Sequence, residues 1–323
     1  MRKALCVGIN AYPNGNALHA CLNDANEIAQ LLKKNSDESP NFEVLLENDV
    51  PDKATLRSHI AKLFSGDCET ALFYFSGHGF LNELGGFLVT PDFTQYDEGV
   101  SMNDILSFAN QSKIKDKIII LDCCHAGKMG SPNVDNQTTQ IGEGLSILTA
   151  CRDNESAIEL GNGHGIFTNL LIEALKGGAS DLLGNITPAG IYSFIDQALG
   201  AWYQRPVFKT NITRFTPLRK VKPPVSIDVL RSIKEYFHEP TEEYPLDPSY
   251  EYTNTPSDKH QLVKPYATEE HIHIFKDLQK LQSVGLVVPC GEQFMYYAAM
   301  NSKTCKLTPL GQHYWQLAIK ELV

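Results

Sequence analysis

The chain has 323 residues and a formal net charge of −10, with 28 lysines and arginines against 38 aspartates and glutamates. Hydrophobic residues make up 42% of it, which is enough for a packed core and excludes wholesale disorder. The acidic balance argues against bulk nucleic-acid binding, and no apolar run approaches the roughly 18–20 residues that cross a bilayer. We therefore expect a cytoplasmic protein of about two domains, with its eight cysteines reduced and no zinc-type cysteine spacing.

From residue 1 to about 215, short apolar runs alternate with amphipathic helical patterns. The five strand candidates are Ala4–Ile9, Phe42–Glu47, Thr70–Phe75, Lys117–Cys123 and Ser146–Cys151. Helical patterns lie between and after them at Asn23–Lys34, Lys53–Phe64, Met102–Gln111 and Ile166–Lys176. Because the strand runs are continuously apolar, they are expected to be covered on both faces. The alternation predicts an α/β domain with a mostly parallel sheet flanked by helices.

The segment 217–226, PLRKVKPPVS, interrupts this pattern with three prolines and three basic residues. It predicts a solvated linker between a first domain at 1–216 and a second domain at 227–323. The second domain is expected to be α+β, with an acidic stretch at 239–258 that has no period and predicts a long loop. Its expected helices are Ile227–Phe237, Thr268–Val284 and Leu310–Leu322, and its β-like runs are Leu286–Val288 and Phe294–Ala299.

Two of the apolar strands run directly into polar segments that carry reactive side chains. One strand is followed by SGHG, which contains His78 and Gly79, and another leads into CCHAG, which contains Cys123 and Cys124. Catalytic groups gather at the carboxyl ends of parallel strands, so His78 and one cysteine meet if these strands are neighbours. The pair predicts a cysteine peptidase, with an oxyanion hole formed by the N–H groups of Gly79 and Cys124. Each motif alone is a weak signal, because strand cysteines are usually apolar fillers and glycine-flanked histidines are usually structural.

With these motifs in place, the chain resembles the caspase-like cysteine peptidases, and among them the metacaspases and prokaryotic caspase homologues. The resemblance covers about residues 1–215 and rests on ALCVGIN, CLNDANEI, YFSGHG, LDCCHAG, TACRDNESA and HGIFTNLLIEAL. It implies that His78 is the general base and Cys124 the nucleophile. It also implies that Cys123 occupies a position where metacaspases commonly have serine, and that His125 is structural.

The resemblance further implies that Asp24, Ser76 and Asp122 line the S1 pocket. Asp122 stands where animal caspases carry a glutamine that helps to hold an acidic P1 side chain. Two carboxylates in a confined pocket attract a guanidinium or ammonium group, so we expect protein or peptide substrates with Arg or Lys at P1. The alternative roles are helix capping for Asp24 and turn formation for Asp122.

Calcium is a possible cofactor by resemblance, although the sequence requires none. Calcium-dependent metacaspases use carboxylates after the histidine strand and one beyond the cysteine motif. The candidates here are Asp92, Asp97, Glu98 and Asp104. After Cys124, however, no acidic residue follows until Asp135, so a solvated acidic loop is the alternative.

The loop Lys128–Gly144 corresponds to a region where family members are often cut. Lys128 is its only basic residue, so it is the candidate autoprocessing site.

Residues 227–323 resemble a winged helix, on the cadence LxxLxxxGLV followed by LTPLG. Winged helices often bind DNA, but residues 225–323 hold nine basic and thirteen acidic residues, a net charge of −4. Phosphate binding needs a basic stripe, so we expect an adaptor that docks an upstream sensor or activator protein. Its aromatic residues Tyr296, Tyr297, Tyr314 and Trp315 are expected in the core.

The expected function is therefore that of a cysteine endopeptidase, by analogy a bacterial defence or programmed-death effector. The alternatives are an inert caspase-like scaffold and a winged-helix DNA-binding regulator.

Overall fold

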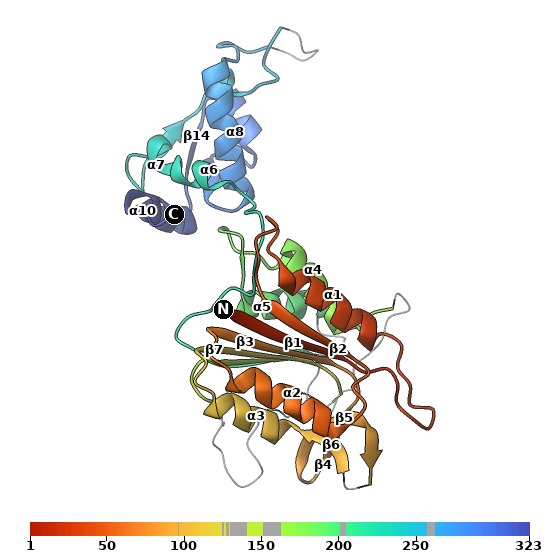
Figure 1. The fold of residues 1–323 in the computed structure, drawn as a ribbon. Coiled ribbons are helices and arrows are strands. Elements are labelled where there is room, and N and C mark those ends of the chain that lie inside the picture. Colours follow the sequence, from red (N-terminus) through yellow and green to blue (C-terminus); the bar gives the residue numbers. More distant parts are fainter. Residues whose placement is uncertain are drawn as a thin grey trace. The chain divides into compact units, whose positions relative to one another are not determined.

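The computed structural model describes residues 1–95, 97–124, 126, 129, 141–150, 163–200, 205–256 and 262–323. These residues form two compact units, Met1–Lys222 and Pro223–Val323, which are coloured red to green and cyan to blue in Figure 1. His125, Lys128 and Asp135 lie outside the described residues, and so does Cys151 at the end of the last predicted strand. No described helix is long and apolar enough to cross a membrane.

A six-stranded sheet with strand order β10-β8-β7-β3-β1-β2 forms the centre of the first unit. All neighbouring pairs are parallel except β10 with β8, which is antiparallel. The strands are β1 (Arg2–Gly8), β2 (Glu43–Asn48), β3 (Thr70–Ser76), β7 (Asp116–Asp122), β8 (Leu145–Thr149) and β10 (Val207–Asn211). The predicted α/β class with a mostly parallel sheet is confirmed.

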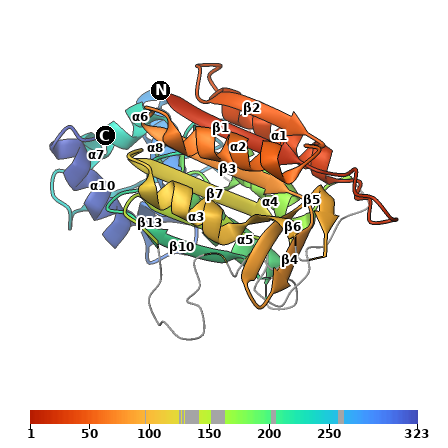
Figure 2. The same cartoon turned by 60° about the horizontal axis from the view of Figure 1, so that its bottom comes forward.

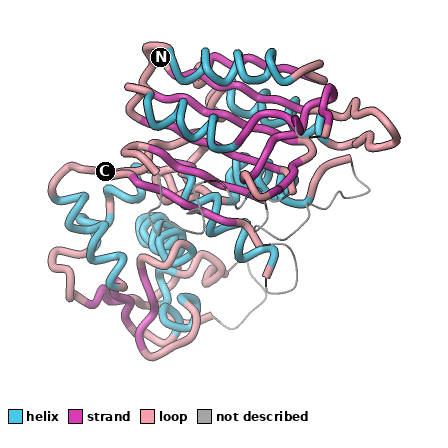
Figure 3. The backbone as a smooth tube through the Cα atoms, turned by 90° about the horizontal axis from the view of Figure 1, so that it is seen from below, coloured by secondary structure: helices cyan, strands magenta, loops and turns pink. Residues whose placement is uncertain are grey.

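Helices cover both faces of this sheet, as Figures 2 and 3 show. One face carries α2 (Lys53–Ser65) and α3 (Met102–Gln111). The other carries α1 (Cys21–Lys33), α4 (Ile166–Glu173) with the π-helical turn η2 (Ala174–Gly178), and α5 (Pro188–Leu199). This two-sided cover explains why every residue of β3 and β7 is buried.

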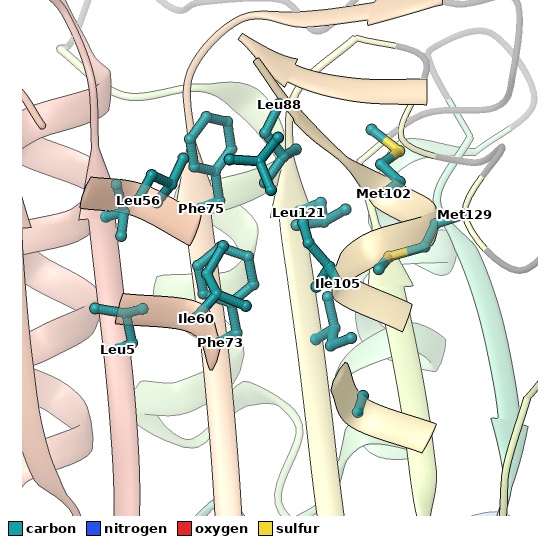
Figure 4. Close-up of a cluster of buried hydrophobic side chains, with 14 of the residues drawn as sticks. Leu5, Leu56, Ile60, Phe73, Phe75, Leu88, Met102, Ile105, Leu121 and Met129 are labelled. Carbon is teal, nitrogen blue, oxygen red and sulfur yellow. The ribbon is translucent and has the colours of Figure 1, made fainter. Parts of the chain in front are cut away.

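The side chains of β3 alternate between the two resulting cores. Phe73 and Phe75 pack with Leu56 and Ile60 of α2, as Figure 4 shows. Tyr74, between the two phenylalanines, belongs to the core on the opposite face. This period of two is the strand geometry that the sequence predicts, and burying each large side chain contributes about 1.5–3 kcal/mol.

A second, antiparallel sheet follows β3 directly and was not predicted. Its strands are β4 (Gly79–Asn82), β5 (Gly85–Thr94) and β6 (Asp97–Ser101), in the order β4-β5-β6. The segment is polar and rich in glycine, and the register of β5 with β6 shifts between Val89 and Thr94. The weak alternation that such an irregular pairing leaves in the sequence explains why no strand is predicted for this segment.

The predicted linker at 217–226 is only partly correct. β11 (Arg219–Lys220) pairs with β9 (Asn185–Ile186), and Leu218 is fully buried in the first unit. Proline-rich sequence favours extended backbone, and here part of that backbone is a strand instead of a solvated connection. The division between the units falls after Lys222.

The second unit is α+β. It contains a three-stranded antiparallel sheet in the order β12-β14-β13, with α6 to α10 and the 3₁₀ turn η3 around it. The strands are β12 (Glu243–Pro245), β13 (Val287–Cys290) and β14 (Thr304–Leu307). The helical segments are α6 (Ile227–Arg231), α7 (Ile233–Tyr236), η3 (Pro248–Tyr250), α8 (Glu269–Ser283), α9 (Met295–Met300) and α10 (Pro309–Ile319). A winged-helix identity for this unit stays a prediction.

The second unit corrects two predicted elements. Phe294–Ala299 was expected as a strand, but α9 occupies it, with Met295, Ala298 and Ala299 buried at helical spacing. The stretch 239–258 was expected as a loop, but it contains β12 and η3. Its backbone is held by the buried side chain of Asn254, whose amide donates to the carbonyls of Pro248, Val263 and Pro265.

The aromatic residues of this unit also differ from expectation. Tyr296 and Tyr297 are 37% and 49% exposed, so their assignment to the core is wrong. Both lie on the side of α9 that faces away from Ala298 and Ala299. Tyr314 and Trp315 are half-buried, and the indole N–H of Trp315 donates to the Phe237 carbonyl over 2.6 Å.

Candidate active site

The two reactive segments leave the central sheet side by side. β3 and β7 are parallel neighbours, with Ser76 opposite Asp122 at their carboxyl ends. Just beyond this pair, the N–H of Gly77 donates to the Asp122 carbonyl over 3.3 Å. The expectation that the histidine and cysteine strands are neighbours is confirmed.

The two adjacent cysteines face different environments. Cys123 is fully buried in the core beneath α2 and α3, whereas Cys124 lines a cavity at the sheet edge. A Cβ added at Gly79 would lie 2.0 Å from the carbonyl oxygen of Cys124, so only glycine fits there. The backbones of Gly79 and Cys124 are therefore in direct contact at the Cys124 carbonyl. The oxyanion hole expected from their N–H groups stays a prediction.

His78 is held by two residues of the loop between β1 and α1. Its Nε2 lies 2.7 Å from the carbonyl oxygen of Asn16, and its backbone N–H donates to the Tyr12 hydroxyl over 3.0 Å. The Tyr12 ring packs on the imidazole with ring centroids 4.5 Å apart. A carbonyl oxygen can only accept, so Nε2 carries the proton and Nδ1 of the neutral ring remains a proton acceptor. Tyr12 and Asn16 were not identified from the sequence.

A cavity of about 100 Å³ joins the predicted catalytic and S1 side chains. It is lined by Leu18, Ala20, Cys21, Asp24, Ser76, Gly77, His78, Asp122, Cys124 and Gly165. Two larger cavities, of about 300 and 360 Å³, lie elsewhere in the first unit. No cysteine is found among the described residues that line either of them, so they offer no thiol nucleophile.

Asp24 is almost completely buried, with an exposed fraction of 1%. Its carboxylate accepts hydrogen bonds from three donors: His164 Nδ1 at 2.7 Å, Ser76 Oγ at 3.1 Å and the Gly165 N–H at 3.4 Å. Burial raises the pKa of Asp24, and these hydrogen bonds offset only part of that rise. The capping alternative is wrong, because α1 begins at Cys21 without a side-chain cap.

Asp122, the last residue of β7, is the second buried carboxylate of the cavity, with 5% of its surface exposed. Its Oδ2 accepts from the Thr168 hydroxyl over 2.7 Å, and Thr168 lies 2.6 Å from the Tyr74 hydroxyl. Burial, followed by the nearby charges of Asp24 and Asp122, raises the pKa of Tyr74 well above its usual value. Tyr74 therefore stays neutral beside the two carboxylates.

Gly165 is the point where the two carboxylates come together. A Cβ built there would lie 2.8 Å from Asp122 Oδ2 and 3.6 Å from Asp24 Oδ2. Gly165 precedes α4, and Thr168 on its first turn reaches Asp122, while His164 reaches Asp24. The segment HGIFT therefore positions both acids. The sequence signal is the motif HGIFTNLLIEAL, which contains His164, Gly165 and Thr168.

The calcium candidates do not form a cation site in the described residues. Asp97 pairs with Lys53 over 2.6 Å and Asp104 with Arg57 over 3.1 Å, while Asp92 accepts from the Lys53 backbone over 3.1 Å. Within the described ranges, no group of three or more His, Cys, Asp or Glu side chains is arranged to hold a metal. The described carboxylates therefore form no assembled calcium site, and a role for calcium stays a prediction.

The family model of the caspase domain matches residues 1–211. The chain belongs to the caspase domain family. It is therefore a member of a family of cysteine peptidases, which are hydrolases that act on proteins. The crystal structure of Caspase-1 from Spodoptera frugiperda is similar to this caspase-family chain, with a TM-score of 0.49 and 12% identity, covering 68% of this chain and 90% of that one. A comparison with curated proteins gives no match.

Proposed function

We propose that this caspase-family chain is an active cysteine endopeptidase, with Cys124 as the nucleophile and His78 as the general base. The observation that carries the proposal is the parallel pairing of β3 with β7, from which His78 and Cys124 emerge at one sheet edge and line one cavity. The hydrogen bond from His78 Nε2 to Asn16 supports it, because it leaves Nδ1 as the basic atom.

In the proposed reaction, His78 Nδ1 takes the proton from the Cys124 thiol as sulfur attacks the scissile carbonyl carbon. The oxyanion that forms is stabilised by the N–H groups of Gly79 and Cys124. When the C–N bond breaks, His78 returns the proton to the leaving amine and a thioester remains on Cys124. Water, deprotonated by His78, then attacks the thioester, which releases the carboxylic acid and restores the thiol.

The proposed substrates carry Arg or Lys at P1. The support is the pair of buried carboxylates, Asp24 and Asp122, which line the same cavity as Cys124. The negative charges of the two carboxylates would compensate the positive charge of a guanidinium or ammonium group bound between them, and they would repel an acidic P1 side chain.

A fluorogenic peptide with Arg at P1 tests the activity. We expect Cys124→Ala and His78→Gln each to lower kcat/KM at least about 1,000-fold. The first variant removes the thiol that attacks the substrate, and the second removes the base that deprotonates this thiol. Cys68→Ala is a matched control, since Cys68 is a partly buried thiol that does not line this cavity. Equal turnover by Cys124→Ala and the parent chain would refute the enzyme and favour an inert scaffold.

We further propose that the second unit docks an upstream sensor or activator protein, in a defence or programmed-death response. Exposed aromatic side chains on α9 support a protein-docking role, because such side chains are enriched at protein interfaces. Phe294 and Tyr297 are 53% and 49% exposed and their ring centroids are 6.3 Å apart. The test is affinity capture with the full-length Cys124→Ala chain. A partner that is lost with Phe294→Ser and Tyr297→Ser supports docking.

A further inference from the structure

A polar cavity of about 360 Å³ lies at the end of the central sheet that is opposite to the candidate active site. It is bounded by the loop before β7, by residues 143–144 before β8 and by residues 212–214 after β10. β7 runs from Asp116 to Asp122, which at about 3.3 Å per residue places the cavity roughly 20 Å from the catalytic edge. Its volume lies within the range of roughly 300–1,000 Å³ that is typical of small-molecule sites, so it can hold a ligand distinct from the peptide substrate.

Basic side chains dominate the charges that line this cavity. The charged lining residues are Lys113, Lys115, Lys117 and Arg214, against Asp116 and Glu143. Four basic and two acidic residues give the lining a net charge of +2, although the whole chain carries −10. None of the four basic side chains forms an ion pair with a described residue, and Asp116 already accepts from the Thr216 hydroxyl over 2.7 Å. The lining therefore favours an anionic ligand.

Lys117 is the buried member of this basic set, with 5% of its surface exposed. An ammonium group has three N–H donors, and among the described residues the partner of Nζ is a neutral group, the Glu143 carbonyl at 2.8 Å. Burial lowers the pKa of Lys117, and the nearby charges of Asp116 and Glu143 offset only part of this effect. Charges buried this deeply are normally paired in proteins. Lys117 therefore lacks a full counter-charge, which a bound anion would supply.

We propose that this cavity binds a small molecule through its diphosphate group alone, which Lys117 and the three exposed basic side chains of the lining hold. Guanidinium and ammonium groups are the side chains with which proteins bind phosphate oxygens. A diphosphate group carries at least two negative charges, which matches the net charge of the lining. Among the described residues that line the cavity, none is aromatic, so a nucleobase has no stacking partner there. This binding does not depend on the proposed peptidase activity.

Titration calorimetry of the full-length chain with pyrophosphate tests this site. At constant ionic strength we expect one pyrophosphate to bind per chain, with a Kd below about 1 mM. Sulfate brings a single tetrahedral anion that reaches fewer of the basic groups, so it should bind at least about tenfold more weakly. ADP carries the diphosphate group on a nucleoside and should not bind more tightly than pyrophosphate, because its nucleobase finds no stacking partner.

Two double variants with the same change in net charge locate the binding site. Lys113→Gln with Arg214→Gln removes two exposed basic groups from the cavity, so we expect the Kd for pyrophosphate to rise at least about tenfold. Lys3→Gln with Lys62→Gln is the matched control, because both lysines line the separate cavity of about 300 Å³. We expect the control to keep the Kd of the parent chain. Lys117→Met keeps the apolar part of the buried side chain and should also raise the Kd at least about tenfold.

Several results would overturn the proposal. They are the absence of pyrophosphate binding, sulfate binding as tight as that of pyrophosphate, and equal Kd values for the cavity variant and its control. ADP binding at least about tenfold tighter than pyrophosphate binding would overturn recognition through the diphosphate group alone. The cavity variant changes only exposed side chains, so a test of its site remains if Lys117→Met fails to fold. All titrations can be repeated with Cys124→Ala, so binding to an inactive chain supports this site even if the proposed peptidase activity fails.

Discussion

Replacing Asp24 by asparagine changes specificity and stability in opposite directions. The substitution keeps the shape of the side chain and removes its negative charge from a position that is 1% exposed. On the proposed function, the charge serves substrate binding, while the shape of the side chain also accommodates its contacts with His164, Ser76 and Gly165. Asp24→Asn is therefore expected to weaken recognition of arginine and to stabilise the fold.

The loss of specificity follows from one missing charged partner. Hydrogen bonds to charged groups contribute about 1.5–3 kcal/mol, which corresponds to a decrease of about 10- to 100-fold in kcat/KM for an arginine peptide. Asp122 remains in the cavity, so the preference for arginine is reduced without being abolished. Cleavage of a matched peptide with citrulline at P1, which has the shape of arginine without its charge, should change much less, because it carries no charge for Asp24 to bind.

The gain in stability follows from the raised pKa of Asp24, which burial causes. A raised pKa means that the folded state binds the proton more tightly than the unfolded state does. The stability from this group is therefore complete below the unfolded pKa and is lost as the pH rises through the folded pKa. Above the folded pKa the folded chain carries the penalty of a buried carboxylate, and asparagine, which resembles the protonated acid, removes it. Each 1 kcal/mol recovered should raise the Tm of the first unit by about 2–4 °C.

Peptide kinetics and calorimetry test the two effects separately. We expect Asp24→Asn to raise the Tm of the first unit at pH 7.5, with a smaller difference from the parent chain at pH 4. Glu27→Gln is the control on the same helix, because Glu27 is 42% exposed and pairs with Lys176 over 3.4 Å. An unchanged arginine-to-citrulline ratio would refute the S1 role of Asp24. A lower Tm at pH 7.5 would refute the stability argument.

Three further predictions concern the backbone at the site, metal dependence and the second unit. Gly79→Ala should lower kcat at least tenfold, because the added Cβ would lie 2.0 Å from the Cys124 carbonyl oxygen. Gly66→Ala is the control and should leave kcat unchanged, because its nearest neighbour would be 3.7 Å away; equal rates for the two variants would contradict the close packing at Gly79. Chelation with EDTA should leave activity unchanged, since Asp97 and Asp104 already pair with basic side chains, and a loss restored by calcium would contradict this. The full-length chain should not bind duplex DNA measurably at 50 or 200 mM salt; binding that weakens with salt would favour the DNA-binding alternative.

The central sheet could be predicted because its strands are short apolar runs separated by amphipathic helices. Elements outside it were harder to predict, for two physical reasons. β4 to β6 are polar and irregular, so they leave little alternation in the sequence. α9 was mistaken for a strand because its run of large apolar residues fits either period, and only the burial of Met295, Ala298 and Ala299 distinguishes them.

In the candidate site, too, some residues could be predicted from their local sequence, whereas contacts between residues far apart in the chain could not. His78 and Cys124 were identifiable because each follows an apolar strand, and parallel strands bring such positions to one edge. The contact of His164 with Asp24 joins residues 140 positions apart, and that of Asn16 with His78 joins residues 62 apart. Such contacts depend on how α4 and the loop after β1 pack on the sheet, which residue spacing alone does not fix.

The register of β3 with β7 couples the proposed recognition and chemistry. Ser76 lies opposite Asp122, and Cys124 follows two residues after Asp122. β7 ends at Asp122, and in the bend and turn that follow it Cys124 lines the cavity together with Asp122, while Cys123 is fully buried in the core. The turn after β7 therefore places Cys124, and not Cys123, in the cavity that holds the proposed P1 subsite.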